Sequence, residues 1–144
     1  MINKFRGKYY FLSNFYDFPV RYQGLEYLNA EAAFQAQKTL NQNIKENFCG
    51  LTPDQAKRKG RHIQLRSDWE KVKDKIMYEI VFNKFAYDAV MKNRLLDTGE
   101  ELLEEGNTWR DYYWGTCNGR GKNKLGHILM QVREELKNND ADSI

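Results

Sequence analysis

The chain contains few of the residues that stabilise small secreted domains or hold metal ions. Its two cysteines, Cys49 and Cys117, form neither a disulfide framework nor the CxxC motif of a redox or zinc site. The two histidines, His62 and His127, have no metal-ligating residue at short spacing. We therefore expect reduced thiols and no bound metal ion, as is usual for proteins of the cytosol.

Long apolar runs and a strong charge imbalance are also missing. No stretch approaches the length of a membrane span, and the N-terminal sequence MINKFRGKYYF lacks the apolar region of a signal peptide. The net charge of +3 is well below that of a concentrated basic face that binds nucleic acid tightly and without specificity. We expect a cytoplasmic protein with no membrane partner, whereas phosphorylated small molecules and a modified nucleotide remain possible ligands.

The pattern along the chain predicts one domain over residues 1–144, with a core from about 5 to 136, because no segment resembles a linker or a repeat. Aromatic and β-branched residues between 5 and 27, interrupted by glycine and proline, predict short strands or extended segments. Helices are expected over 30–40 after the N-cap Asn29, over 53–60 behind a Thr52–Gln55 capping box, and over 124–136 after the N-cap Asn123. A long helical stretch is expected behind a second such box at Ser67 and Glu70, with its end at Thr98 and Gly99. The predicted fold class is α+β, mainly helical, with a few short N-terminal strands.

One glycine-rich stretch, YYWGTCNGRGKNKLG at residues 112–126, invites comparison with phosphate-binding loops. It is not a Walker A motif, because five residues separate Gly115 from Gly121 and Asn123 replaces the magnesium-binding Ser or Thr. It is not a dinucleotide fingerprint, because Lys124 stands where the third glycine is required. Two interpretations remain: a loop whose backbone and following helix hold a different phosphate, or a tight turn with solvated lysines.

A second feature is the predicted helix containing NAEAAFQAQK. It places Glu31, Phe34, Gln35 and Lys38 on one side, at steps of three and four residues. A stripe that mixes an aromatic ring with two opposite charges suits a pocket wall better than a core or an open surface. The alternative is an amphipathic helix whose ends carry ordinary surface charges.

Four blocks of the sequence, FLSNFY, YQGLEYLNAEAAFQAQK, EGNTWRDYYWG and GKNKLGHILMQVR, occur in an order that resembles the NADAR superfamily from about Phe5 to Arg133. The resemblance implies an N-glycosidase that needs no cofactor and cleaves the bond between C1 of a phosphorylated ribose and a nitrogen. It implies two substrate classes. One is ADP-ribose attached to the exocyclic amine of guanine, in DNA or a nucleotide, which the slight basic excess favours. The other is a phosphorylated ribosylamine, an early intermediate of riboflavin synthesis. No obligate protein partner is implied.

The same blocks indicate the site residues. Matching the blocks places nine residues in the site: Ser13, Asn14, Glu31, Lys38, Asn107, Trp109, Asp111, Trp114 and Asn123. Among these we expect Lys38, Glu31 and Asp111 to be catalytic and the others to contact the substrate, together with Phe34 and Gln35 of the helix stripe and Gly115 and Lys122 of the glycine-rich stretch. Gly115, Lys122 and the helix that begins near Asn123 are expected to hold the sugar phosphate.

Two mechanisms fit these residues. In the first, the amine of Lys38 forms a Schiff base with C1 while Glu31 or Asp111 transfers protons. In the second, Glu31 and Asp111 act as a pair of carboxylates in direct hydrolysis, and Lys38 only binds phosphate or orients Glu31. A binding module for ADP-ribose or NAD without catalytic activity, and a domain for protein interaction, are the alternatives from other classes.

Overall fold

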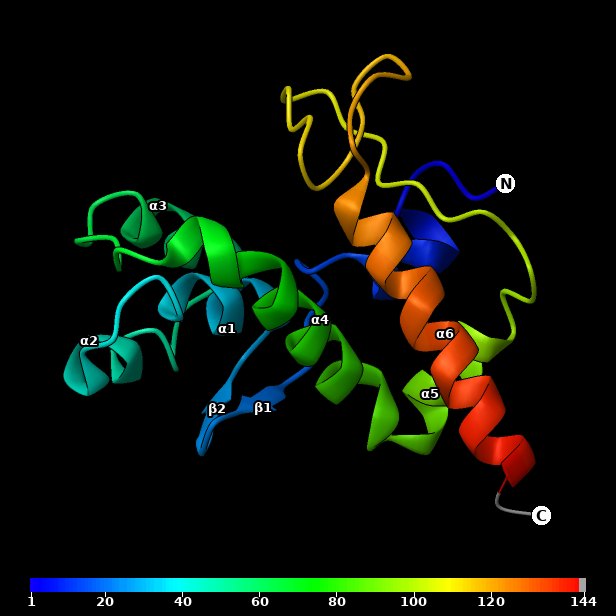
Figure 1. Ribbon diagram of the computed structural model, residues 1–144, viewed down its shortest axis with the longest axis horizontal. Helices are drawn as coiled ribbons and strands as arrows, with labels where there is room; N and C mark the ends of the chain where they lie inside the picture. The colour runs from blue at the N-terminus through cyan, green and yellow to red at the C-terminus, as the bar shows by residue number, and fades with distance from the viewer. Residues whose placement is uncertain (143–144) are drawn as a thin grey trace. The chain divides into compact units, whose positions relative to one another are not determined.

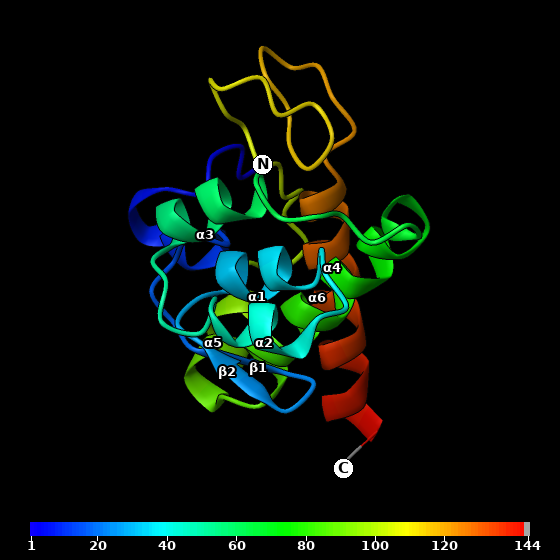
Figure 2. The ribbon, with the colours of Figure 1, turned by 90° about the vertical axis from the view of Figure 1, so that its left-hand side faces the viewer.

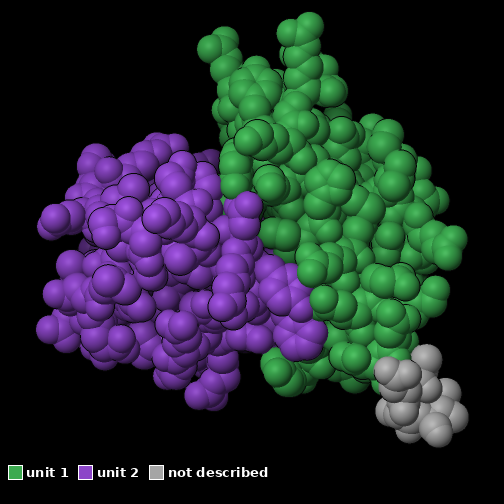
Figure 3. Space-filling model, viewed as in Figure 1, with its two compact units in different colours: residues 1–13, 85–144 green, residues 14–84 purple. Residues whose placement is uncertain are grey.

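The computed structural model describes residues 1–142, and its contacts divide the chain into two compact units (Figures 1 and 3). One unit consists of residues 14–84, and the other combines residues 1–13 with the chain from residue 85 onward. The described residues form seven helices and one two-stranded sheet, which confirms the prediction of a mainly helical α+β fold. That residues 1–144 form a single domain stays a prediction, and residues 143–144 lie outside the described part.

The unit of residues 14–84 begins with a β-hairpin of β1 (Val20–Tyr22) and β2 (Leu25–Tyr27). Gln23 and Gly24 connect the two strands, and both have positive φ angles, +48° and +85°, as a tight two-residue hairpin turn requires. Val20, Tyr22 and Tyr27 are buried, so one face of this small sheet packs inward.

Four helices follow in this unit: α1 (Ala30–Ala36), α2 (Gln42–Glu46), α3 (Pro53–Gly60) and most of α4 (Trp69–Ala86). The predicted caps of the first and third are confirmed. The side chain of Asn29 accepts a hydrogen bond of 2.8 Å from the N–H of Ala32, and Thr52 and Gln55 form the expected capping box. Four alanines on α1 are fully buried, which allows close helix packing, and α3 lies directly beside α1 (Figures 1 and 2).

The other unit contains a 3₁₀-helix, η1 (Gly7–Leu12), together with α5 (Ala89–Leu96) and α6 (Lys124–Asp142). A long loop covers residues 97–123 between the last two helices. The predicted apolar stripe of α6 is confirmed, since all five of its members are buried: Leu125, Ile128, Leu129, Val132 and Leu136.

Three boundary predictions were wrong. Residues 7–12 are helical and not extended, with Tyr9 N–H and Ser13 N–H bonded three residues back. The α1 helix ends at Ala36 and not at 40, because Gln37 and Lys38 turn with i−3 hydrogen bonds. The long helical stretch expected from 69 to Thr98 and Gly99 divides at Asp88, whose side chain caps α5 by accepting from Met91 N–H at 2.9 Å.

The second predicted capping box was also wrong. Asp68 precedes α4, and its carboxylate bonds to Arg66, while Glu70 pairs with Lys73 at 2.6 Å instead of reaching back to the backbone. Within residues 1–142, no helix combines the length and the apolar character needed to cross a membrane.

Candidate active site

The residues of α1 that the sequence predicts to line a pocket are almost all buried. Glu31 is 8% exposed, Phe34 is 4% exposed and Gln35 is 6% exposed. Lys38, in the turn that follows the helix, is half-buried. The alternative of an ordinary amphipathic helix with solvated charges does not describe Glu31, because a carboxylate is rarely buried without a specific reason.

The Glu31 side chain is fixed by its neighbour one turn along the helix. Nε2 of Gln35 donates a hydrogen bond of 2.9 Å to Oε1 of Glu31. The other amide atom, Oε1 of Gln35, is buried and has no hydrogen-bond partner among the described residues. It lies against Gly60 of α3, where a Cβ atom would approach it to 1.9 Å. Gly60 therefore provides the space in which Gln35 can orient Glu31.

Asn14 contacts the same region from the chain segment before β1. Its carbonyl oxygen accepts a hydrogen bond of 3.1 Å from Glu31 N–H, and its Nδ2 lies 3.4 Å from the sulfur of Met77. Oδ1 of Asn14 is the second buried acceptor without a hydrogen-bond partner among the described residues. Two buried acceptors without a hydrogen-bond partner, on Gln35 and Asn14, are unusual in a folded protein, and such groups call for a functional explanation.

Electrostatics distinguish Lys38 from an ordinary surface lysine. Burial lowers the pKa of its ammonium group, Glu31 acts in the opposite direction, and the charges of Arg61 and Lys57 lower the pKa further. A lowered pKa increases the fraction of neutral amine near neutral pH, which is the form that acts as a nucleophile.

Two residues that the sequence did not single out for the site support this region. The ring of Trp69 packs on Phe34 with a centroid distance of 5.1 Å. The N–H of Arg66 donates to the carbonyl of Lys38 at 2.8 Å, and its guanidinium binds Asp68 through two hydrogen bonds of 2.6 and 3.0 Å. No pattern in the sequence signals either contact, since both depend on where the chain returns after α3.

The second group of predicted residues lies in the long loop of the other unit. Oδ1 of Asp111 accepts hydrogen bonds from the N–H groups of Tyr113 and Trp114, at 3.1 and 2.9 Å. The Asn107 side chain bonds to both backbone groups of Asp111, at 3.1 Å to its N–H and 3.0 Å to its carbonyl. The Asp111 carboxylate thus organises a turn, a role that the W-x-D-x-x-W spacing alone did not reveal.

Aromatic side chains surround this turn. Trp109 and Tyr112 are about half exposed, at 49% and 47%, so their rings are accessible for stacking. Trp114 packs edge-to-face on Tyr113 with centroids 4.9 Å apart, and the ammonium of Lys122 lies 5.3 Å from the Tyr113 ring. The loop therefore presents an exposed aromatic and cationic surface.

The glycine-rich part of this loop differs from the expected phosphate cradle. Four successive N–H groups, of residues 122–125, donate to the carbonyls of residues 112–115 over 2.8–3.2 Å. These groups are therefore satisfied within the loop and are not offered to an anion. Gly115 is required for another reason, because a Cβ atom there would lie 2.2 Å from the carbonyl oxygen of Glu105.

Asn123 precedes α6 as predicted, but its side chain does not cap the helix. Its φ angle is +51°, in the left-handed region that asparagine tolerates better than most residues. Oδ1 accepts from Glu105 N–H at 3.0 Å, and Nδ2 donates to the carbonyl of Leu103 at 2.9 Å. Asn123 thus connects the two ends of the loop.

The predicted site residues divide between the two units. Asn14, Glu31, Phe34, Gln35 and Lys38 belong to the unit of residues 14–84 and gather around α1. The remaining eight belong to the other unit, and all except Ser13, which ends η1, are in the long loop or at its end: Ser13, Asn107, Trp109, Asp111, Trp114, Gly115, Lys122 and Asn123.

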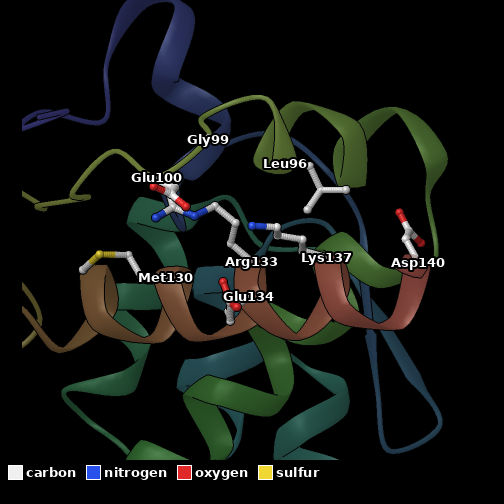
Figure 4. A pocket seen from close by; sticks show the side chains of 8 residues that line it. All are labelled: Leu96, Gly99, Glu100, Met130, Arg133, Glu134, Lys137 and Asp140. Atoms are coloured by element: carbon white, nitrogen blue, oxygen red, sulfur yellow. The ribbon is translucent and has the colours of Figure 1, made fainter. Parts of the chain in front are cut away.

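A cavity of about 540 Å³ in the unit that contains α5 and α6 is lined by none of the predicted site residues (Figure 4). It lies between α5 and α6, and its charged lining alternates in sign, with Arg133 and Lys137 among Glu100, Glu134 and Asp140. Arg133 is buried and donates to the hydroxyl of Thr98 at 2.8 Å. Because Arg133 is held by this hydrogen bond, we interpret the cavity as part of the packing between α5 and α6.

Known proteins resemble this chain in sequence and in fold. Residues 3–137 match the NADAR domain family. The chain is 38% identical to N-glycosidase YbiA of Escherichia coli K12, covering 86% of this chain and 79% of that protein. It is 40% identical to an N-glycosidase of Nostoc punctiforme, covering 88% and 85%, and 36% identical to a riboflavin biosynthesis protein of Vibrio vulnificus, covering 88% and 35%. The NMR structure of E. coli YbiA superimposes with a TM-score of 0.85 at 34% identity, over 98% of this chain and 89% of that one. These relatives support a glycosidase.

Proposed function

This chain belongs to the NADAR domain family, and from that premise we propose that it is an N-glycosidase that hydrolyses the bond between C1 of a phosphorylated ribose and an exocyclic amine. The observation that carries the proposal is the environment of Lys38. Burial and the nearby cations Lys57 and Arg61 lower the pKa of its amine, and the buried carboxylate Glu31 belongs to the same cluster. A lysine with a lowered pKa near an oriented carboxylate suits imine chemistry, because more of its amine is available as the nucleophile.

The proposed reaction begins with the substrate's own nitrogen. Its lone pair forms a C1=N double bond as the ring C1–O bond breaks, and the ring oxygen takes a proton. The amine of Lys38 adds to C1, and the C1–N bond to the base then breaks as that nitrogen accepts a proton. The resulting Lys38 Schiff base is hydrolysed by water, which regenerates the amine and releases the sugar. The net reaction consumes one water molecule and needs no cofactor.

Glu31 is suited to the proton transfers in this sequence. Its Oε1 atom accepts a hydrogen bond from Gln35, which fixes the orientation of the carboxylate. Its burial strengthens its interaction with Lys38, because charges interact more strongly away from bulk water. We assign Glu31 as the acid and base, and Lys38 as the nucleophile.

The Schiff-base scheme draws its two reacting groups from one unit. Direct hydrolysis would instead combine Glu31 with Asp111, and one oxygen of Asp111 already accepts two backbone hydrogen bonds in its turn. We therefore propose that Asp111 shapes the aromatic loop. Phe34 and Asn14, which belong to the same unit as Lys38, are proposed to contact the sugar.

Two substrate classes follow. The first is ADP-ribose on the exocyclic amine of guanine, in DNA or a nucleotide, which the slight basic excess of the chain favours. The second is a ribosylaminopyrimidine phosphate, which is favoured by the similarity to a riboflavin biosynthesis protein of Vibrio vulnificus. Both classes share the C1–amine linkage that the proposed chemistry requires.

A product assay tests the proposal. Wild-type protein is incubated with each substrate class, and the released sugar and free amine are quantified by mass spectrometry. Borohydride added during turnover is expected to reduce the Schiff base and to leave a covalent sugar adduct on Lys38. Lys38→Ala is expected to lose turnover and the adduct together.

Lys45→Ala is the matched control. Lys45 is also half-buried with a pKa lowered by burial, but it lies on α2 and outside the predicted site. It should retain wild-type turnover. A binding module without catalytic activity would release no product from either substrate, and a Lys38→Ala variant with normal turnover would eliminate the covalent mechanism.

A further inference from the structure

The last turn of α3 carries two cations on the side that faces α1. Lys57 and Arg61 are four residues apart, on either side of Gly60, and therefore share one face of the helix. The contact of Gly60 with the Gln35 side chain shows that this face packs toward α1 (Figure 2). Lys57 and Arg61 are therefore close to the residues that surround Glu31.

A second contact locates Lys57 independently. Its ammonium lies 5.8 Å from the centre of the Phe15 ring. Phe15 follows Asn14, whose carbonyl binds the Glu31 N–H. The effect of Lys57 and Arg61 on the pKa of Lys38 agrees with this placement, because both charges act at short range on that amine.

The cluster holds more positive than negative charge. Lys57 and Arg61 both lower the pKa of the Lys38 ammonium, whereas Glu31 raises it, and the guanidinium of the neighbouring Arg66 is bound to Asp68. Cations grouped in one region of the surface favour the binding of an anion. Since α3 ends here, the negative end of its dipole stabilises the cations themselves, so an anion would be bound by the side chains.

We propose that Lys57 and Arg61 form a binding site for the phosphoryl group of the sugar substrate, next to the Lys38 amine. The inference rests on the proposed N-glycosidase function and names the part of the site that selects phosphorylated sugars. Arginine binds phosphate oxygens through two parallel N–H groups, and lysine contributes a mobile point charge. The loop before α6 is a weaker candidate, because its four N–H groups at 122–125 already have carbonyl partners.

Binding of inorganic pyrophosphate, measured by calorimetry at fixed ionic strength, tests the site without requiring turnover. Lys57→Gln and Arg61→Gln are each expected to weaken pyrophosphate binding about tenfold, because each removes a charged hydrogen-bond donor. Arg61→Lys keeps the charge without the paired N–H groups and should recover part of the loss. Both positions lie on an α3 surface that is not fully buried, and circular dichroism checks that each variant folds.

Lys59→Gln is the matched control, since it removes the same charge from the same helix. The Lys59 ammonium lies 5.8 Å from the Phe48 ring, so its side chain has a different neighbour from that of Lys57. Its pyrophosphate affinity should stay within about twofold of wild type, because its charge is screened by salt at longer range. Equal affinity in all of these variants and the wild type would overturn the phosphoryl site.

The pH profile gives a second readout that a purely structural role would not change. Lys57 and Arg61 lower the pKa of Lys38, so removing either charge raises that pKa. The rising limb of kcat/KM should then move to higher pH in Lys57→Gln and Arg61→Gln, and stay in place in Lys59→Gln. If the wild type binds pyrophosphate through these residues but cleaves neither substrate class, the proposed function fails and the anion site remains. If the wild type cleaves substrate but no variant changes the pH profile or the pyrophosphate affinity, the proposed function stands and the proposed phosphoryl site is wrong.

Discussion

The amide oxygen of Gln35 lies directly against the Cα atom of Gly60. A methyl group at residue 60 would lie 1.9 Å from this oxygen and 2.8 Å from the amide carbon, so the whole Gln35 side chain would have to move. Because the same amide orients Glu31 through a 2.9 Å hydrogen bond, the packing of α3 on α1 is connected to the proposed acid–base group.

Replacing Gly60 by alanine should therefore reduce activity far more than stability. Overpacking costs about 1–3 kcal/mol and the better helix propensity of alanine returns about 1 kcal/mol, so we expect a small net loss. Displacement of Glu31 should lower kcat by about 10²-fold. Gly50→Ala is the control, since its Cβ would meet no atom within 4 Å. Steady-state kinetics and thermal unfolding distinguish the two effects, and an active Gly60→Ala enzyme would contradict the proposed role.

Replacing Lys38 by methionine should stabilise the protein while abolishing turnover. The folded-state pKa of Lys38 is lowered, so its contribution to stability is present above the ordinary lysine pKa and is lost as pH falls through the folded value. At neutral pH the ammonium therefore opposes folding, and methionine removes this effect. We expect a gain of about 1 kcal/mol, seen as a rise in Tm of about 2–5 °C.

The exposed Lys75 of α4 provides a comparison for this change, since Lys75→Met should alter stability by less than about 0.5 kcal/mol. The advantage of Lys38→Met over wild type should also shrink as the pH is raised above the ordinary lysine pKa, where the amine is neutral in both the folded and the unfolded state. A Tm that falls on substitution would show that the Lys38 ammonium stabilises the fold.

Replacing Glu31 by glutamine should separate its two roles. Glu31 raises the pKa of Lys38, so its neutral isostere lowers that pKa and moves the rising limb of kcat/KM to lower pH. The rate itself should fall by about 10²–10⁴-fold if Glu31 transfers protons. Glutamine at 31 still offers an oxygen to Gln35 Nε2, so the α1 geometry is retained. Glu26→Gln, on the exposed side of β2, should change neither the limb nor the rate.

Two substitutions of Asp111 distinguish a turn-forming residue from a catalytic carboxylate. Asparagine retains the Oδ1 acceptor for Tyr113 and Trp114, whereas alanine leaves both N–H groups without it. We expect Asp111→Asn to keep activity within a few fold, and Asp111→Ala to lose about 1–3 kcal/mol of unfolding free energy. A 10²-fold loss in Asp111→Asn would instead favour direct hydrolysis with Asp111 as the second carboxylate.

Local chemistry explains which elements the sequence predicted correctly. Asn29 and Thr52 cap their helices, and the apolar stripe of α6 is buried, because these features depend on residues three or four positions apart. The division at Asp88 was missed because hydrophobic spacing continues across it to Val90, which is 68% exposed. A single capping carboxylate outweighs that pattern.

The site was predictable only where its residues share one helix. The stripe from Glu31 to Lys38 could be found from spacing, and its burial agrees with the pocket-wall interpretation. Lys57 and Arg61 read as ordinary surface cations, and Gly60 as a helix stop. The roles that we propose for them depend on the packing of α3 on α1, which no local pattern contains.

Asn123 fastens the chain at both ends of the aromatic loop, holding Leu103 and Glu105 with one amide, while Gly106 and Thr116 pair further along. The residues between these two ends can change without altering how the loop is closed. Its contents can lengthen or diversify at a small entropic penalty, since closure depends weakly on loop length and the flanking helices keep their own packing. Substitutions within residues 107–114 should therefore leave α6 and the two hydrogen bonds of the Asn123 amide intact.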